Sequence, residues 1–268
     1  MDRWILHCDM NSFFASVELL SHPELKDQPV AVGGNPKDRH GIILAKNEAA
    51  KKYGIKTAET IWSAKKKCPQ LVLLPPHHDK YDEYCAEINK IYLRYTDMVE
   101  PFSIDESWLD VTGSLGHFGR SAVRLADEIR SVVRNETGLT LSAGVSFNKI
   151  FAKMGSEYKK PDATTLIDRS NYKDILWPMP VRELFFVGAV TAEKLRKMNV
   201  LTIGDLAQSD PEFLSVALGK HGTQLYIYAN GLDDSPVARY QDRREYKSVG
   251  NGITFKRNLL GRDRKSVV

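Results

Sequence analysis

Two adjacent carboxylates, Asp105 and Glu106, lie between two apolar runs that have the character of β-strands. The first run covers residues 98–104 and the second covers residues 107–112. Neighbouring side chains of a strand point to opposite faces, so two adjacent acids converge on one site only where the chain turns. The pattern predicts a β-hairpin with Asp105 and Glu106 at its tip. Asp-Glu is a poor sequence for a tight hairpin, and a broken local rule is typical of a functional site.

The chemistry that needs two hard, anionic oxygen ligands so close together is binding of a divalent metal, with Mg²⁺ as the first candidate. The alternative is a solvated acidic turn, which is common in proteins. Asp110 is close in sequence, but strand alternation places it away from the tip, so it is interpreted as structural.

Composition sets the broad class of the chain. Its 268 residues suit one large domain or two small ones, and 42% hydrophobic with 27% charged residues is ordinary for a globular protein. No apolar stretch is long enough to span a membrane, and the N-terminus lacks a signal-peptide pattern. The three cysteines lack metal-ligand spacing, so we expect reduced thiols and a cytoplasmic location.

The net charge of +4 is unevenly placed. Residues 235–268 carry nine Lys or Arg side chains and three acids, a net charge of +6, which leaves −2 for residues 1–234. A basic C-terminal stretch could follow a phosphate backbone, or it could be a solvated linker, and charge alone does not separate the two.

Hydrophobic periodicity and cap residues predict an alternation of strands and helices. The predicted strands, besides the two of the hairpin, cover residues 3–8, 29–34, 41–45, 140–147 and 162–167. The predicted helices cover a segment capped by Asn11 or Ser12 and running through Leu20, and then residues 47–53, 60–67, 79–95, 119–136 and 148–158.

Removing residues 22–77, which have the character of a small inserted lobe, leaves an approximate β-α-β-β-α-β order. That order predicts an α+β fold of the ferredoxin-like type, a sheet with helices on one face. In this fold the end of the first strand lies near the central hairpin. Asp9 would then stand beside Asp105 and Glu106, about 96 residues away in sequence. Three carboxylates at one sheet edge favour a two-metal site.

Residues 172–232 are predicted to be mainly helical. An apolar run, a glycine turn at Gly188 and a helix opening at Thr191 resemble a helix-hairpin-helix. Such turns offer backbone N–H groups to a phosphate, although glycine-containing helix turns also occur for purely structural reasons.

These segments together resemble the Y-family DNA polymerases, the translesion group that includes bacterial DNA polymerase IV and the ImpB/MucB/SamB and UmuC proteins. The resemblance covers essentially the whole chain. It rests on motifs at Asp9–Glu18, Ser103–Asp110, Gly144–Lys149 running on to Lys160–Pro161, Val187–Thr191 and Lys247–Gly250.

The resemblance implies a role for individual residues. Asp9, Asp105 and Glu106 match the catalytic, metal-binding carboxylates, and Met10 matches the residue whose backbone carbonyl joins one of two Mg²⁺ ions. The other implied contacts are to nucleotide and DNA. Phe14 matches the steric gate that excludes a 2′-hydroxyl, Phe13 lies beside it, Lys51 and Lys160 match substrate-binding positions, and Gly188, Val190 and Thr191 match the DNA-contacting hairpin.

One departure from the family pattern lies in the inserted lobe. The family usually has a Tyr and an Arg that contact the triphosphate, where this chain has Glu48 and Lys51. A Lys can supply the charge of an Arg but not its bidentate fork. We therefore expect weaker nucleotide affinity with the same reaction.

The resemblance also implies a domain organisation. The palm would be formed by residues 1–21 and 78–168, the fingers by 22–77 and the thumb by 169–232. Residues 233–247 would be a linker, and 248–268 would begin a little finger that needs more residues than follow, so we expect a trimmed chain.

The implied function is template-directed, low-fidelity DNA synthesis across damaged DNA without proofreading. The partners would be primer-template DNA and dNTPs, and a sliding clamp would bind through a segment beyond residue 268; no membrane is involved. One alternative is a catalytically impaired DNA-binding accessory protein on the same fold. Another is a nucleotidyl cyclase, which also uses a ferredoxin-like metal site.

Overall fold

The computed structural model describes residues 3–34, 41–242, 248–250 and 255. Contacts divide the described residues into two compact units, one formed by residues 3–11 and 83–242 and the other chiefly by residues 12–34 and 41–82. The start of the predicted little finger lies almost wholly outside the described residues, as do all the basic residues of the C-terminal stretch except Arg239. No helix of the described segments is long and apolar enough to cross a bilayer.

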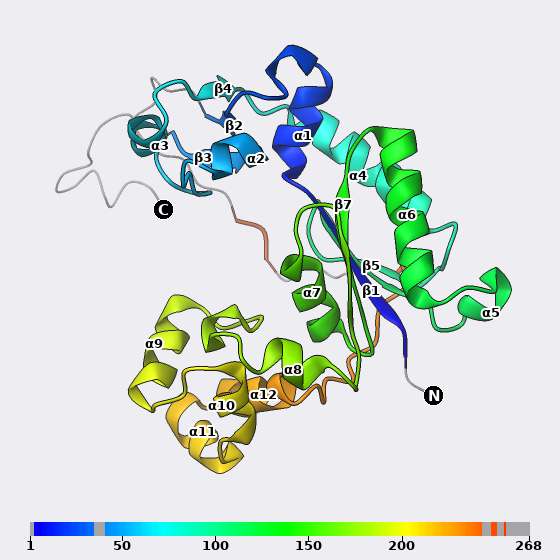
Figure 1. Ribbon diagram of the computed structural model, residues 1–268, viewed down its shortest axis with the longest axis vertical. Coiled ribbons are helices and arrows are strands. Elements are labelled where there is room, and N and C mark those ends of the chain that lie inside the picture. Colours follow the sequence, from blue (N-terminus) through cyan, green and yellow to red (C-terminus); the bar gives the residue numbers. More distant parts are fainter. Residues whose placement is uncertain (1–2, 35–40, 243–247, 251–254, 256–268) are drawn as a thin grey trace. The chain divides into compact units, whose positions relative to one another are not determined.

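The first unit is built on a five-stranded sheet (Figure 1). Its strands are β1 (Ile5–Met10), β5 (Val99–Pro101), β6 (Glu106–Asp110), β7 (Leu141–Ser146) and β8 (Thr164–Ile167), in the spatial order β5-β6-β1-β7-β8. All neighbours are antiparallel except β7 and β8. The first four strands in chain order have the arrangement of a ferredoxin-like fold, so the predicted α+β class is confirmed.

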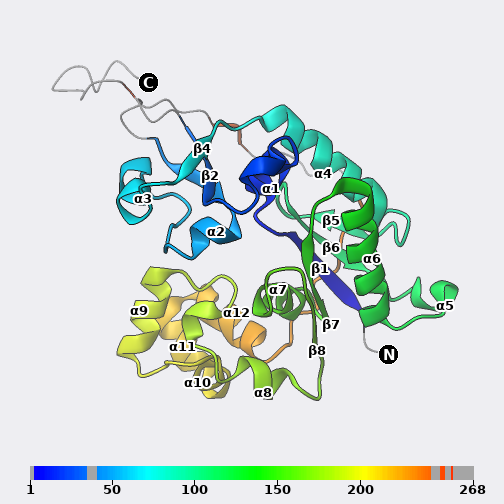
Figure 2. The same cartoon turned by 45° about the horizontal axis from the view of Figure 1, so that its top comes forward.

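Helices cover both faces of this sheet. α4 (His78–Tyr92) and α6 (Ala122–Thr137) lie on one side, and α7 (Lys149–Tyr158) lies on the other (Figures 1 and 2). The expectation of helices on one face only is therefore wrong. The reason is local, because β7 carries Gly144 on the α7 side, where a Cβ would lie 1.8 Å from the Ala152 carbonyl oxygen. Only glycine lets the helix approach so closely.

Several predicted boundaries shift, each for an identifiable reason. The helix predicted over residues 119–136 begins later, at Ala122, and forms α6, whose first turn is capped by the Ser121 hydroxyl accepting the Arg124 N–H. Residue Gly119 is left-handed and ends a separate short helix, α5 (Leu115–Phe118), just before it. Before α1 (Phe13–Leu20), Ser12 occupies the cap position in a left-handed conformation and its side chain caps nothing. The predicted Ser12 cap is therefore absent.

The remainder of the first unit is helical. Its elements are α8 (Tyr172–Leu176), the 3₁₀ turn η2 (Val181–Glu183), α9 (Ala189–Lys197), α10 (Ile203–Gln208), α11 (Pro211–Leu218) and α12 (Lys220–Ala229). Leu195, Leu206, Leu214 and Leu225 are fully buried in their shared core. α9 begins at Ala189 behind Gly188, so the prediction that Thr191 opens this helix is two residues late.

The second unit contains a three-stranded sheet of β2 (Val30–Gly33), β3 (Ile43–Lys46) and β4 (Val72–Leu74), in the order β3-β2-β4. β4 was not predicted from the sequence. Around the sheet lie α1, η1 (Pro23–Leu25), α2 (Glu48–Lys51) and α3 (Ile61–Lys67). The side chain of Asn47 accepts the Ala50 N–H and also the Val30 N–H, so one residue caps α2 and fixes it to β2.

Candidate active site

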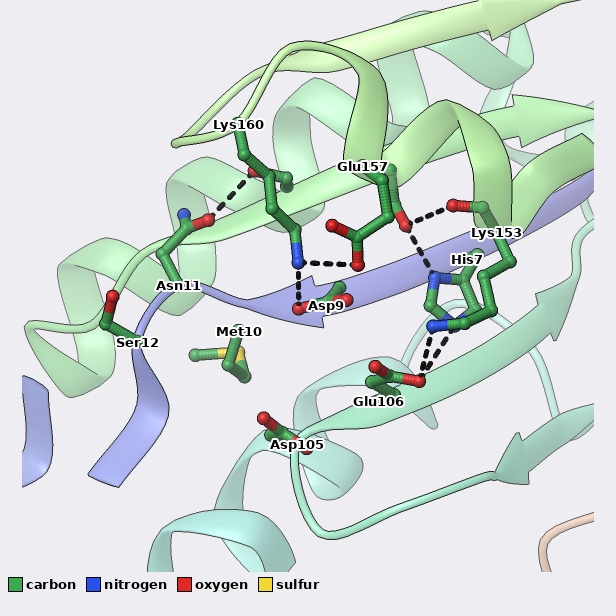
Figure 3. A network of polar contacts seen from close by, with 12 residues as sticks. His7, Asp9, Met10, Asn11, Ser12, Asp105, Glu106, Lys153, Glu157 and Lys160 are labelled. Carbon is green, nitrogen blue, oxygen red and sulfur yellow. Dashed lines mark hydrogen bonds and ion pairs between the residues drawn. The ribbon is translucent and has the colours of Figure 1, made fainter. Parts of the chain in front are cut away.

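Strand pairing brings the predicted acidic residues together. Asp9 of β1 lies directly opposite Glu106 of β6, and the Met10 N–H donates to the Asp105 carbonyl oxygen at 3.0 Å. Figure 3 shows Asp9, Asp105 and Glu106 around the same space. The hairpin differs from the one predicted, because Glu106 is the first residue of β6 and the loop ends at Asp105. The backbone pairing with β1 holds Glu106 in the strand.

Asp9 is an unusually placed acid. Its side chain is buried; Oδ1 lies 2.8 Å from Lys160 Nζ, and Oδ2 has no hydrogen-bond partner among the described residues. Burial raises the pKa of Asp9 to about 8, although the Lys160 ammonium opposes this. The carboxyl group therefore lacks enough positive charge around it to ionise fully at neutral pH.

Glu106 is stabilised in the ionised form. Lys153 Nζ of α7 donates to Glu106 Oε2 at 2.8 Å, and the buried His7 Nε2 lies 3.6 Å from the same oxygen. Burial alone would raise the pKa of Glu106, but His7 and Lys153 outweigh it and lower this pKa to about 2. Burial lowers the pKa of His7 to about 4, so the imidazole is neutral and Lys153 supplies the positive charge.

A fourth carboxylate, Glu157 of α7, belongs to this cluster and was missed by the sequence reasoning. One ligand atom each from Asp9, Glu106 and Glu157 lie within 4.8 Å of one another. Glu157 Oε1 also accepts from Lys160 Nζ at 2.9 Å. The available signal was helical spacing, since Lys153, Glu157 and Lys160 recur at intervals of four and three residues.

Asp105 lies at the edge of the same cluster. The Ser103 hydroxyl donates to Asp105 Oδ1 at 2.7 Å, and the Asp105 carboxylate is not among the three that lie within 4.8 Å of one another. Burial raises the pKa of Asp105, although the Ser103 hydrogen bond opposes this. Like Asp9, Asp105 is a carboxyl group in which a nearby cation would favour ionisation.

These residues fit a divalent cation. They supply clustered oxygen donors and a buried carboxylate oxygen with no partner among the described residues. The Lys160 ammonium against Asp9 shows that a positive charge is attracted to this position. Hard oxygen ligands of this kind are what Mg²⁺ and related ions bind in proteins. The acidic cluster is therefore a candidate metal site.

A cleft of about 500 Å³ opens beside the cluster. One wall is α7, which contributes Lys153 and Glu157; the other consists of Met179, Glu183 and Phe185 from the helical region. Lys153 thus contacts both Glu106 and the cleft. Because this cavity is lined by both apolar and charged side chains, it is suited to a ligand that is itself amphipathic.

In the second unit, the predicted gate residue Phe14 is stacked on Tyr81, with ring centroids 4.0 Å apart and an angle of 9° between the planes. Tyr81 is held in turn by the buried Glu18, which accepts its hydroxyl hydrogen bond and one from the backbone N–H of His77. Phe13 is buried in the core, while Phe14 is half-buried. Of the two neighbours, Phe14 is the one whose ring is partly exposed and therefore accessible to a ligand.

Of the remaining predicted contact residues, Lys51, Gly188 and Val190 are exposed, and Thr191 is half-buried. Lys51 Nζ is 2.6 Å from Glu48 Oε1, which also accepts from the Ser12 hydroxyl at 3.2 Å. Gly188 precedes α9, and Val190 in the first turn is 74% exposed. An apolar side chain so exposed beside a helix N-terminus is available for contact with another molecule.

Comparison with protein families agrees with these features. The impB/mucB/samB family matches residues 8–157, and the IMS family HHH motif matches residues 169–200. The first match contains Asp9, Asp105, Glu106 and Glu157; the second contains the turn at Gly188.

Two curated relatives illustrate the similarity. DNA polymerase IV of Acetivibrio thermocellus is 51% identical over 263 residues, which cover 98% of this chain and 66% of that protein. DNA polymerase IV 1 of Bacillus subtilis is 43% identical over 253 residues, or 94% of this chain and 60% of that protein. The chain thus spans 60–66% of the length of these relatives.

Solved structures show the same fold. The crystal structure of DinB from Sulfolobus solfataricus aligns with a TM-score of 0.80 and 26% identity, covering 87% of this chain and 69% of that one. A Dbh ternary complex aligns with a TM-score of 0.79 and 26% identity, covering 87% and 68% of the two chains.

Proposed function

Because this chain belongs to the impB/mucB/samB family, we propose that it catalyses template-directed DNA synthesis. It transfers a nucleotidyl group from a dNTP to a primer 3′-hydroxyl, with low fidelity, across damaged DNA and without proofreading. Support comes from relatives named DNA polymerase IV and from the ternary complex among the similar structures.

The observation that carries the proposal is the pairing of Asp9 with Glu106 beside Asp105, in a cluster with a buried, unpartnered carboxylate oxygen. These three carboxylates and the Met10 carbonyl would hold two Mg²⁺ ions. Such ions supply Lewis-acid activation of the primer hydroxyl and neutralise the charge of the triphosphate. No other part of the described chain offers a comparable ligand set.

Residues around the cluster have complementary roles. Lys153 keeps Glu106 ionised and fixes the direction of its carboxylate. Lys160 is held between Asp9 and Glu157, and its ammonium is the group that would contact the triphosphate. Lys51 would add a second positive charge to the triphosphate.

Phe14 would pack beneath the sugar and exclude a 2′-hydroxyl, with Phe13 supporting it from the core. The stacking of Phe14 on Tyr81 supports this assignment, because a steric gate works only if its ring is held in place. The cleft between α7 and Phe185 would receive the primer end. Gly188, Val190 and Thr191 would contact the DNA backbone.

The domain organisation is part of the same proposal. Residues 1–21 and 78–168 form the palm, 22–77 the fingers, 169–232 the thumb, 233–247 a linker and 248–268 the start of a little finger. A sliding clamp would bind beyond residue 268, and the location would be cytoplasmic.

Primer extension tests the proposal directly. With Mg²⁺ and dNTPs, the chain is expected to add the templated nucleotide to a primer and to insert nucleotides opposite an abasic site. A catalytically impaired accessory protein would bind the substrate without extending it. A nucleotidyl cyclase would need no template, so omission of the template strand separates that alternative.

A further inference from the structure

Helices α2 and α3 belong to the second unit (Figure 2). Together with the segments around them they carry a basic surface with exposed aromatic rings. Residues 46–70 contain seven lysines and two glutamates, a net charge of +5. Both glutamates are already paired, since Glu48 lies 2.6 Å from Lys51 Nζ and Glu59 lies 2.6 Å from Lys67 Nζ. The other five lysines form no ion pair within the described part of the chain. The segment therefore has unneutralised positive charge.

Trp62 of α3 is the most exposed large ring of this surface. It is 69% exposed and takes no part in the apolar core of the lobe, which includes its helix neighbours Ile61 and Ala64. Lys66, one turn later, places its ammonium 3.8 Å from the centre of the Trp62 ring. This cation–π contact orients the indole at the surface without burying it. A large ring so exposed contributes little to folding and is available to a ligand.

A second ring lies on the neighbouring loop. Tyr53 is 44% exposed, and its hydroxyl accepts a hydrogen bond from Gln70 Nε2 at 2.9 Å. Lys67 Nζ donates to the Gly54 carbonyl at 2.9 Å, which ties the end of α3 to the residue next to Tyr53. The two aromatic residues and the lysines of α3 therefore belong to one connected surface segment.

Positive charge and exposed rings together select one class of ligand. A single nucleic-acid strand presents phosphates to lysines and unstacked base faces to aromatic rings, and base–aromatic stacking tolerates any sequence. A duplex hides its base faces in the stack. An acidic peptide would satisfy the lysines but would bring no planar ring for Trp62.

We propose that this surface, defined by Tyr53, Trp62, Lys65 and Lys66, binds single-stranded DNA. A base stacks on Trp62, and the lysines contact the flanking phosphates. If the chain is a polymerase, the bound strand would be the part of the template that has not yet been copied. This identification of the strand rests on the proposed function, whereas the binding of single-stranded DNA does not.

Binding of the full chain to a labelled oligo-dT, measured by fluorescence anisotropy without metal or dNTP, tests the proposal. Trp62→Ala is expected to weaken binding by about 5- to 150-fold, the range for loss of one stacked base. Trp62→Phe keeps a ring and is expected to retain most of the affinity. Lys65→Glu with Lys66→Glu should weaken binding and flatten its salt dependence. Lys90→Glu, at an exposed lysine of α4, is the matched control and should have little effect.

Three results would overturn the proposal. The first is unchanged oligo-dT affinity for Trp62→Ala, with circular dichroism showing an intact fold. The second is that Trp62→Ala loses as much affinity for a blunt duplex as for oligo-dT, which would mean that the surface contacts phosphates alone. The third is displacement of oligo-dT by a poly-glutamate peptide as effectively as by unlabelled oligo-dT, which would indicate an acidic protein partner. The binding assay contains no dNTP or metal, so its result does not depend on whether the chain extends primers. A failure of the proposed polymerase activity and a failure of this proposal can therefore be told apart.

Discussion

At the scale of single residues, Asp9 is an acid whose buried environment disfavours its ionised form. A carboxyl group with a pKa near 8 in the folded chain and about 3.9 in the unfolded chain binds a proton more tightly when folded. Such a group does not change the free energy of unfolding below about pH 4, and it lowers this free energy progressively as the pH rises toward 8. Asp9 is thus a destabilising residue that the candidate metal site explains.

We therefore predict that Asp9→Asn stabilises the metal-free protein at pH 8. The amide removes the cost of ionising a buried acid, and Lys160 keeps Glu157 as its partner. In EDTA, the melting temperature should rise by roughly 2–4 °C per kcal/mol gained, and the gain should vanish near pH 4. Asp110→Asn is the control, because Asp110 lies outside the acidic cluster and its side-chain oxygen accepts the Thr112 N–H. A lower melting temperature for Asp9→Asn at pH 8 would contradict this account.

Phe14 and Tyr81 give a second prediction at this scale. Phe14→Ala should raise ribonucleotide incorporation relative to deoxynucleotide by at least about tenfold, a typical effect of removing a steric contact in a binding pocket. Tyr81→Leu, which removes the stacked ring behind Phe14, should raise it less. Leu20→Ala, at an exposed position of the same helix, should leave the ratio unchanged. The measurement is the kcat/KM ratio for the matched ribonucleotide and deoxynucleotide.

The residues of the cluster were only partly predictable from the sequence. Asp105 and Glu106 stand out because two adjacent acids interrupt strand-like runs, and fold order brings Asp9 to them. Glu157 and His7 carry no such mark. They join the cluster because α7 packs on the sheet face that carries Gly144. The helical spacing of Lys153, Glu157 and Lys160 shows that these three side chains share one helix face, but not which face of the sheet that helix covers.

At the scale of elements, the close packing of α7 on β7 depends on Gly144. A Cβ at this position would lie 1.8 Å from the Ala152 carbonyl oxygen and 2.5 Å from the Ser156 backbone nitrogen. These are backbone atoms, which cannot move aside as a flexible side chain would. α7 carries Lys153, Glu157 and, just beyond it, Lys160, so this contact also positions the charges around the site.

Gly144→Ala is consequently predicted to destabilise the chain by about 3 kcal/mol or more, at the upper end of the usual cost of overpacking. Gly113→Ala is the control, because no atom lies within 4 Å of a Cβ built there. Urea denaturation followed by circular dichroism gives the free energy of unfolding of each variant. Equal stability of the two variants would show that the helix–strand contact is looser than described.

Element boundaries were predictable where a cap residue and periodicity agree, as for α3, which Thr60 caps through the Ser63 N–H. They shifted where tertiary pairing decides. Glu106 belongs to β6 rather than to the hairpin tip because its backbone is paired with Asp9. β4 is only three residues long and half-buried, too short for alternation to reveal.

At the scale of the whole molecule, the order of strands and helices was sufficient to predict the ferredoxin-like sheet, since few topologies connect a β-α-β-β-α-β chain without crossings. The packing of the small helices between residues 172 and 229 was not predictable, because each is too short to carry a pattern of its own. Their shared core, with Leu195 and Leu225 fully buried, is defined only by tertiary contact.

The central claim is that Asp9, Asp105 and Glu106 together make this chain a metal-dependent polymerase. Single-turnover primer extension in Mg²⁺, comparing Asp105→Ala with Asp110→Ala from the same hairpin, tests it most directly. We predict that Asp105→Ala slows incorporation at least about 10³-fold, as expected for loss of several kcal/mol of charge stabilisation, with the fold unchanged. Asp110→Ala should extend primers at close to the wild-type rate. If Asp105→Ala stays within about tenfold of wild type, the acidic cluster does not hold the catalytic metal, and the account is wrong.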